Sequence, residues 1–201
     1  MKVKLGLKNV VYAKVTITDG VDPTFGTVKS WPGAVNLNLD VQGENYSFWA
    51  DDGPYYERNG NAGYSGDLET ALVPDDFKLN HLGYYEDVNG NIIEDPDLDG
   101  DPFALGYTIS GDKDNRPVWL YNCIASRPAS GGGTKTENTE VKTETCTITA
   151  RPVDFPSLNR RAAKGYPGPN TTAAYKASYL DQVTPPAAAK TQANPPAGGN
   201  G

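Results

Sequence analysis

The densest group of side chains that could do chemistry is an acidic stretch between residues 94 and 101. Its carboxylates are Glu94, Asp95, Asp97, Asp99 and Asp101. Within it, the segment DPDLDG imitates the first half of an EF-hand loop, in which carboxylate oxygens bind calcium. However, Pro102 stands at a later apolar position, Gly106 stands where such a loop needs a bidentate Glu, and no pair of helices is predicted around it. We therefore favour an exposed acidic turn over a calcium site.

The other candidates for chemistry are one histidine, His81, and two cysteines, Cys123 and Cys146. This set argues against a zinc site, which needs more ligands of these types. No Ser, Cys or acid forms a recognisable catalytic set around His81, so we expect a surface or interface histidine and no enzyme activity. We expect no metal and no cofactor.

The two cysteines lie on either side of the glycine run Gly131–Gly133. A hairpin symmetric about that run would place Cys123 opposite Cys146, where the two could oxidise if the geometry permits. We favour the alternative, two buried free thiols that act as small hydrophobes.

Length and charge limit the possible functions. The chain has 201 residues and a net charge of -7, with a pI near 4.7. This acidic balance argues against a protein that grips nucleic acid through phosphates, although nucleic acid could still slide past such a surface. We expect no membrane segment, because no run of about eighteen apolar residues occurs. The first residues also lack the apolar region and cleavage site of a signal peptide.

The clearest long-range feature is a predicted hairpin between Pro117 and Pro152. Its two arms alternate with period two and are rich in β-branched and aromatic residues, and a Gly/Ser/Thr-rich connection joins them. Neither arm has a plainly polar face, since Trp119 and Tyr121 oppose Leu120 and Ile124. A strand at the rim of a lone domain normally has one polar face, so we expect a core on one side and a partner subunit on the other.

Most of the remaining chain also predicts strands, separated by Gly, Pro, Asn and Asp turns. The expected strands cover residues 7–18, 25–32, 35–41, 46–50, 65–73, 84–87, 92–94 and 103–110. The clearest is Val35 to Val41, in which Asn36, Asn38 and Asp40 form a polar but mostly uncharged face. We expect the strand at residues 46–50 to pair beside it.

One helix is predicted at Pro74–Gly83, because a proline and two aspartates open it and a glycine closes it. We expect Phe77 and Leu82 to hold it on the sheet. Near-helical spacing of Thr172, Tyr175, Tyr179 and Val183 indicates a second short helix. The predicted domain is residues 1–184, with a core at 6–152 and an irregular docking segment at 153–184. Residues 185–201 are rich in Pro, Ala and Gly and predict a flexible tail.

The order of motifs resembles the major tail tube proteins of phages with long, non-contractile tails. The segments that carry the resemblance are GLKNVVYAKVT at 6–16, PGAVNLNL at 32–39, YSFWADDGPYY at 46–56, GYSGDLETALVPDDFKLNHLGY at 63–84, DVNGNIIE at 87–94, FALGYTISGDKDNRPVWLYNCIASRP at 103–128 and TETCTITARP at 143–152. Together they span most of residues 6–152 in the order expected for that family.

The resemblance implies a mainly β protein, a β-sandwich closing toward a small barrel with one short helix on its flank. It also implies six subunits in a ring, whose inner strands join a continuous barrel, and rings that stack into a tube. In such a virion the tube encloses the tape measure protein and later guides the genome DNA. Tail terminator and distal tail proteins bind its ends, and the tail is assembled in the host cytoplasm.

On this basis we expect Asn36, Asn38 and Asp40 to line the lumen. For contacts between subunits or rings we favour two segments, of which the first could equally be plain surface coil. One is the Gly/Asn-rich loop around Pro54–Gly63, with the tyrosines Tyr55, Tyr56 and Tyr64. The other is the hairpin tip, with Gly131, Gly132, Gly133 and Lys135.

Two other functions remain open from the sequence. The first is a monomeric carbohydrate-binding or adhesion module, in which exposed Tyr and Trp stack on sugar rings and the acidic loop holds calcium. The second is a different structural part of the virion, such as a ring at the tail tip. A glycoside hydrolase is the weakest rival, because nothing places two acids across a cleft.

Overall fold

The computed structural model describes residues 6–50, 53–111, 115–131 and 142–189, with the backbone alone at 45–50 and 53–59. This part of the protein is mainly β, with two short α-helices, as the sequence predicts. Its largest element is an antiparallel sheet of nine strands. The members of this sheet are β1 (Gly6–Thr16), β2 (Thr24–Phe25), β3 (Lys29–Ser30), β4 (Ala34–Gln42), β7 (Gly63–Thr70), β10 (Phe103–Ser110), β11 (Pro117–Ala125), β12 (Glu144–Ala150) and β15 (Lys164–Gly165).

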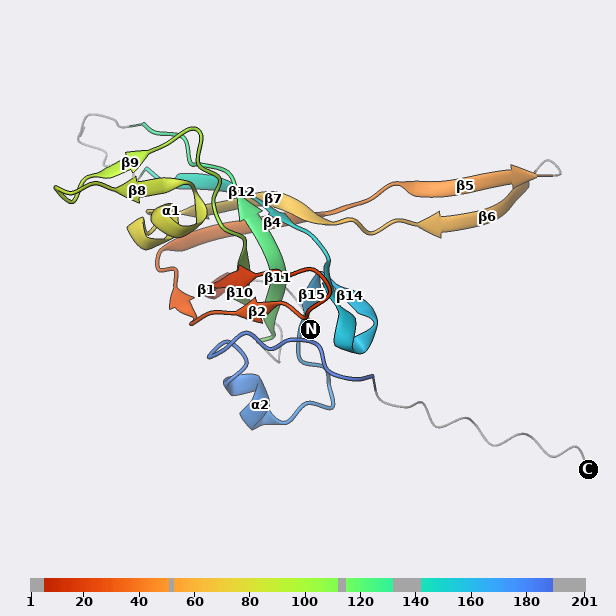
Figure 1. The fold of residues 1–201 in the computed structure, drawn as a ribbon. Helices are drawn as coiled ribbons and strands as arrows, with labels where there is room; N and C mark the ends of the chain where they lie inside the picture. Colours follow the sequence, from red (N-terminus) through yellow and green to blue (C-terminus); the bar gives the residue numbers. More distant parts are fainter. Residues whose placement is uncertain (1–5, 51–52, 112–114, 132–141, 190–201) are drawn as a thin grey trace, which may run out of the picture.

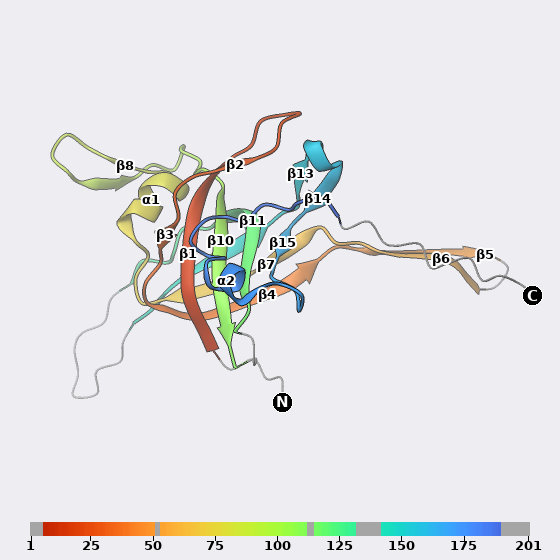
Figure 2. The same cartoon turned by 90° about the horizontal axis from the view of Figure 1, so that it is seen from below.

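The sheet folds over on itself. Its main path runs β2-β1-β10-β11-β12-β7-β4, with β3 paired to β1 and β15 paired to β11. Seen from below, β4 and β7 cross the direction of β1, β10 and β11 at a steep angle (Figure 2). The two halves enclose the main hydrophobic core, which contains the buried side chains of Trp31, Leu68, Phe77, Leu105, Leu120 and Ile148. The result is a sandwich made from one sheet, in which alternate residues of each strand face inward.

The helix α1 (Asp75–His81) closes one end of this core. It begins after Pro74, carries Asp75 and Asp76 in its first turn, and is followed by Gly83 at φ 71°. Phe77 and Leu82 are buried against the sheet, as predicted. Beyond the helix, β8 (Tyr84–Glu86) and β9 (Ile92–Glu94) form the hairpin predicted from its Asn-Gly turn.

The expectation of a surface or interface His81 is wrong, because only 4% of the residue is exposed. Its ring lies among the rings of Tyr12, Phe77 and Phe103, with centroid distances of 5.7, 5.0 and 5.3 Å. Its Nδ1 lies 2.8 Å from the carbonyl oxygen of Asp101. The histidine therefore joins the end of α1 to the loop before β10.

The second face of β11 is covered by the chain's own C-terminal segment, so the partner subunit expected there is not needed. This segment contains β13 (Val153–Phe155), the 3₁₀-helix Pro156–Leu158, β14 (Arg160–Ala162) and α2 (Ala173–Ala177). The Trp119 indole donates a hydrogen bond to the carbonyl oxygen of Tyr179 at 2.8 Å. The Tyr121 hydroxyl donates to the carbonyl oxygen of Thr184 at 3.0 Å. The sequence shows two apolar faces because the chain buries both.

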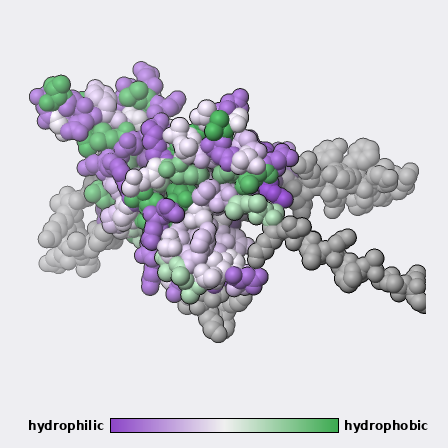
Figure 3. Space-filling model, turned by 60° about the horizontal axis from the view of Figure 1, so that its bottom comes forward, coloured by the Kyte–Doolittle hydropathy of each residue, from purple (hydrophilic) through white to green (hydrophobic). Residues whose placement is uncertain are grey.

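The side of the molecule that is turned forward in Figure 3 carries both hydrophilic and hydrophobic residues. Hydrophilic residues predominate there, and hydrophobic ones form small, separate patches. Because the C-terminal segment packs over Trp119 and Tyr121, these large rings add nothing to the exposed apolar surface.

The alignment of Cys123 with Cys146 that a hairpin symmetric about the glycines would give does not occur. Cys123 lies opposite Ala150, and Cys146 lies opposite Leu68 of β7. The connection between β11 and β12 is not symmetric about the glycines, so the two arms shift past each other. Both cysteines are buried free thiols, which confirms the favoured interpretation. Burial raises the pKa of both thiols, that of Cys146 to about 11.

Two further expectations fail where the chain leaves the sheet. Residues 46–50 do not pair with β4, because β5 (Asn45–Ala50) pairs with β6 (Gly53–Asn59). The two form an arm that projects from the ends of β4 and β7 (Figure 1). The loop expected at Pro54–Gly63 is therefore largely strand. Paired backbones extend β4 and β7 outward, and the sequence did not indicate that residues 45–50 and 53–59 pair with each other.

A pH dependence of stability follows from the buried His81. Desolvation lowers its pKa, and the nearby Asp101 and Asp76 only partly oppose this. In the unfolded chain His81 therefore binds a proton near pH 6.5, whereas in the folded chain it binds that proton only at a lower pH. The free energy of unfolding should stay constant above that range and fall as the pH drops through it, by at most about 1.4 kcal/mol per pH unit. Chemical denaturation between pH 7.5 and 5 measures this, and His81→Gln should have a shallower slope. Equal slopes would contradict the assignment.

Candidate functional site

Nine polar side chains lie in three aligned rows on the exposed face of β4, β7 and β12. We name this surface the polar face. The rows, read across the strands in register, are Asn36, Glu69 and Thr145; Asn38, Asp67 and Thr147; and Asp40, Ser65 and Thr149. Six of these residues are exposed, and Ser65, Glu69 and Thr149 are half-buried. The surface is thus continuous over three neighbouring strands.

Strand alternation produces this face. Successive side chains of a strand point to opposite sides, so the residues between the polar positions face the core. These inward residues include Leu37 and Leu39 of β4, Leu68 of β7, and Cys146 and Ile148 of β12. The apolar set fixes the register, and the register in turn aligns the polar set.

Hydrogen bonds across the strands order the polar face. The Thr147 hydroxyl donates to Asp67 at 2.8 Å. At one end, the Thr143 hydroxyl donates to Glu69 at 2.6 Å. The hydroxyl oxygens of Ser65 and Thr149 lie 3.5 Å apart. Threonine hydroxyls thus hold the carboxylates of Asp67 and Glu69 in place, and other hydroxyls and amides surround these carboxylates.

The polar face carries only negative charge. Of its nine side chains, Asp40, Asp67 and Glu69 are acidic and none is Lys or Arg. Such a surface gives phosphate groups no cation to bind, and its carboxylates repel them within about 10 Å at moderate salt. The net charge of these nine side chains therefore disfavours the retention of a polyanion.

The sequence predicted one third of this face. Asn36, Asn38 and Asp40 lie together on β4 as expected, but their neighbours are β7 and β12 rather than residues 46–50. The alternation in residues 65–73 and the Thr-rich run at 143–149 were visible signals for the other six residues. What was missing was the long-range pairing that brings these strands together.

The strand β4 forms one end of the sheet. In the described part of the chain its only partner is β7. Two of its apolar residues are unusually exposed, Val35 at 54% and Val41 at 63%. A strand of this length with unpaired amides and carbonyls is a template for pairing with another strand. We call this side of β4 the free edge.

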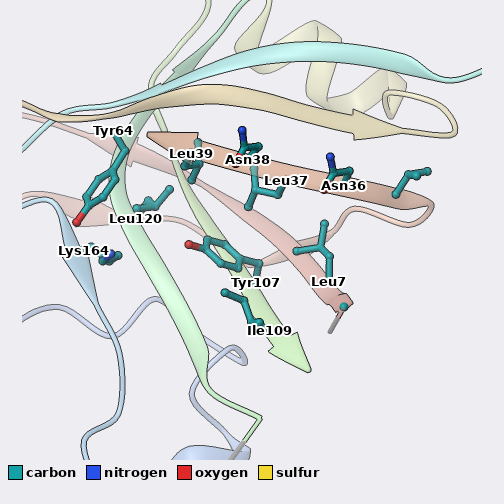
Figure 4. A pocket seen from close by; sticks show the side chains of 12 residues that line it. Leu7, Asn36, Leu37, Asn38, Leu39, Tyr64, Tyr107, Ile109, Leu120 and Lys164 are labelled. Carbon is teal, nitrogen blue, oxygen red and sulfur yellow. The ribbon is translucent and has the colours of Figure 1, made fainter. Parts of the chain in front are cut away.

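A groove of about 500 Å³ lies beside the free edge. Its walls are the inner face of β4, the start of β1 and the end of β10, and its apolar lining includes Leu7, Leu37, Leu39, Tyr107 and Ile109 (Figure 4). At one end the Lys164 ammonium lies 4.3 Å from the centre of the Tyr64 ring. The sandwich is therefore open between β4 and the β1–β10 pair.

The residues expected at subunit contacts are distributed over three places. Tyr55 and Tyr56 belong to β6 in the projecting arm, while Tyr64 belongs to β7 and lines the groove. Gly131 is exposed. Gly132, Gly133 and Lys135 lie outside the described residues. The structure thus does not group the described members of this set, Tyr55, Tyr56, Tyr64 and Gly131, into one surface.

The acidic stretch around residues 94–101 is held by an arginine. Arg127 donates hydrogen bonds to the carbonyl oxygens of Asp95 and Leu98 in this stretch, and to that of Leu82 at the end of α1. The positive charge of the Arg127 guanidinium at these carbonyl oxygens repels any metal cation that would bind to them. Among the described residues, no group of three or more His, Cys, Asp or Glu could hold a metal ion. The calcium alternative therefore gains no support.

Comparison with known proteins gives no family assignment. No family model matches the sequence, and no curated protein matches it either. Within the described ranges, no helix is long and apolar enough to cross a membrane.

Gly66 is the position on which the alignment of β4 with β7 depends. A Cβ atom at Gly66 would lie 1.9 Å from the carbonyl oxygen of Asn38, so the two backbones could not keep their spacing. We expect Gly66→Ala to lower the free energy of unfolding by about 1–3 kcal/mol through this clash. It should also speed hydrogen exchange in β4.

Gly131→Ala is the matched control, because a Cβ there meets nothing within 4 Å. Equal stability of the two variants in urea denaturation would show that β4 does not need this close approach.

Proposed function

We propose that this chain is a structural virion protein that polymerises as stacked hexameric rings into the tail tube of a phage with a long, non-contractile tail. The tube would be the conduit for ejection of the genome DNA. The supporting observations are the polar face, the free edge beside it, and the arm formed by β5 and β6.

The polar face carries this proposal. When sheets join side by side into a closed ring, one face of each sheet forms the inner surface of that ring. A face with hydroxyls, amides and three carboxylates suits that position, because DNA phosphates find no cation on it and are repelled by its carboxylates. DNA can then slide past it without binding.

The free edge supports assembly. Exposed strand edges are filled by neighbours or they template aggregation, and closed cyclic symmetry fills every edge in a ring. The edge of β4 continues the polar face directly, so a neighbour that pairs there would extend that face into the next subunit. The arm extends beyond the body and is suited to contact an adjacent ring.

The proposal also assigns partners to the tube. The tape measure protein would fill the lumen before DNA passes, and tail terminator and distal tail proteins would bind the two ends. The alternative is a monomeric β-sandwich module that binds carbohydrate or serves in adhesion. No contact in the described structure favours that module over the tube.

Electron microscopy of the purified protein tests this proposal. With rising concentration, negatively stained samples should show rings or hollow tubes with six-fold end views, because edge pairing depends on concentration. A monomer at every concentration whose melting temperature rises with calcium or a glycan would contradict the tube and favour the binding module.

A further inference from the structure

The free edge and the groove form a combined site with two different sides. On the groove side, a strand added to β4 would meet the apolar residues Leu37 and Leu39. On the opposite side it would lie next to Asn36, Asn38 and Asp40 of the polar face. The strand that fits this site is therefore apolar at alternate residues and polar, preferably cationic, at the residues between.

Residues 1–5 have this pattern. Their sequence is Met-Lys-Val-Lys-Leu, so Met1, Val3 and Leu5 alternate with Lys2 and Lys4. They lie outside the described residues. The described chain begins at Gly6, which itself lines the groove together with Leu7. The segment is thus attached at the site that it matches.

The length of the segment is also sufficient. Five extended residues span at most about 17 Å, and the stretch of β4 from Asn36 to Asp40 spans about 13 Å. With the apolar residues toward the groove, Lys2 and Lys4 would face the side of Asp40. Asp67 and Glu69 lie one strand further, and no side chain of the polar face itself neutralises these carboxylates.

We propose that residues 1–5 pair with the free edge of β4 in the same chain and cap it in the isolated subunit. The pairing satisfies edge amides and carbonyls, fills the groove with three apolar side chains, and places two ammonium groups beside an acidic surface. Resting on the proposed function, the cap regulates assembly: a neighbouring subunit must displace residues 1–5 before it pairs with β4. The cap thereby keeps the free protein from polymerising prematurely.

Amide hydrogen exchange by NMR tests the cap on dilute protein that sedimentation shows to be monomeric. The full chain is compared with a chain that lacks residues 2–5. Amides of β4 that point away from β7 should exchange at least about tenfold faster in the shortened chain, because their partners are lost. Amides of β12, which pairs with β7 and β11, should not change. Equal β4 rates in the two chains would overturn the cap.

Charge variants test the orientation of the segment. Lys2→Glu with Lys4→Glu should speed β4 exchange, because like charges then meet beside Asp40. The matched control is Arg160→Glu with Arg161→Glu, which makes the same charge change at two exposed residues of β14. An equal effect of both pairs would overturn the proposed charge contact. Protection of β4 that rises with protein concentration would mean that a second copy occupies the edge, and would overturn a cap within one chain.

Electron microscopy of the same two chains separates the cap from the tube. The shortened chain should form rings at a lower protein concentration than the full chain. Faster β4 exchange without rings would support the cap and count against the tube. Rings with unchanged β4 exchange would support the tube and overturn the cap.

Discussion

The register of β4, β7 and β12 is the constraint on which the rest depends. A slip of one residue in any of these strands would exchange its inward and outward side chains. The apolar series of Leu37, Leu68 and Cys146, which lie opposite one another, fixes that register by burial. Gly66 then allows β4 to approach β7 closely. The polar face is thus a direct consequence of core packing on the other side of the same three strands.

The sequence predicted local structure well where pattern and turn chemistry agree. The strand around Val35–Val41, the helix after Pro74 and the hairpin at Asn89-Gly90 all occur near their predicted positions. Long-range pairing was not predictable in the same way, because the connection between β11 and β12 carries no information on register. The symmetric hairpin that would align the two cysteines was therefore wrong, although the favoured interpretation of two buried free thiols is confirmed. His81 was misjudged because its aromatic neighbours Tyr12 and Phe103 come from distant strands.

The C-terminal segment changes how the apolar pattern of β11 is understood. Two apolar faces on one strand are typical either of an interface or of a strand with cover on both sides. Trp119 and Tyr121 are almost fully buried under Phe155 and Tyr179, so the subunit completes this core by itself. The surfaces still suited to self-association are then the free edge of β4 and the projecting arm. The free edge belongs to the half of the sheet that carries the polar face, and the arm is a separate two-stranded sheet that projects from the ends of β4 and β7 in that half.

The central claim is that the polar face lines a closed lumen, and the direct measurement is labelling of an Asn38→Cys variant with a bulky maleimide. Wild-type protein gives the background from its buried thiols, and Val88→Cys, at a fully exposed hairpin residue, is the control. In capped tubes Val88→Cys should label while Asn38→Cys stays unlabelled, and both should label in dissociated subunits. Labelling of Asn38→Cys on intact, capped tubes at the rate of Val88→Cys would contradict the account.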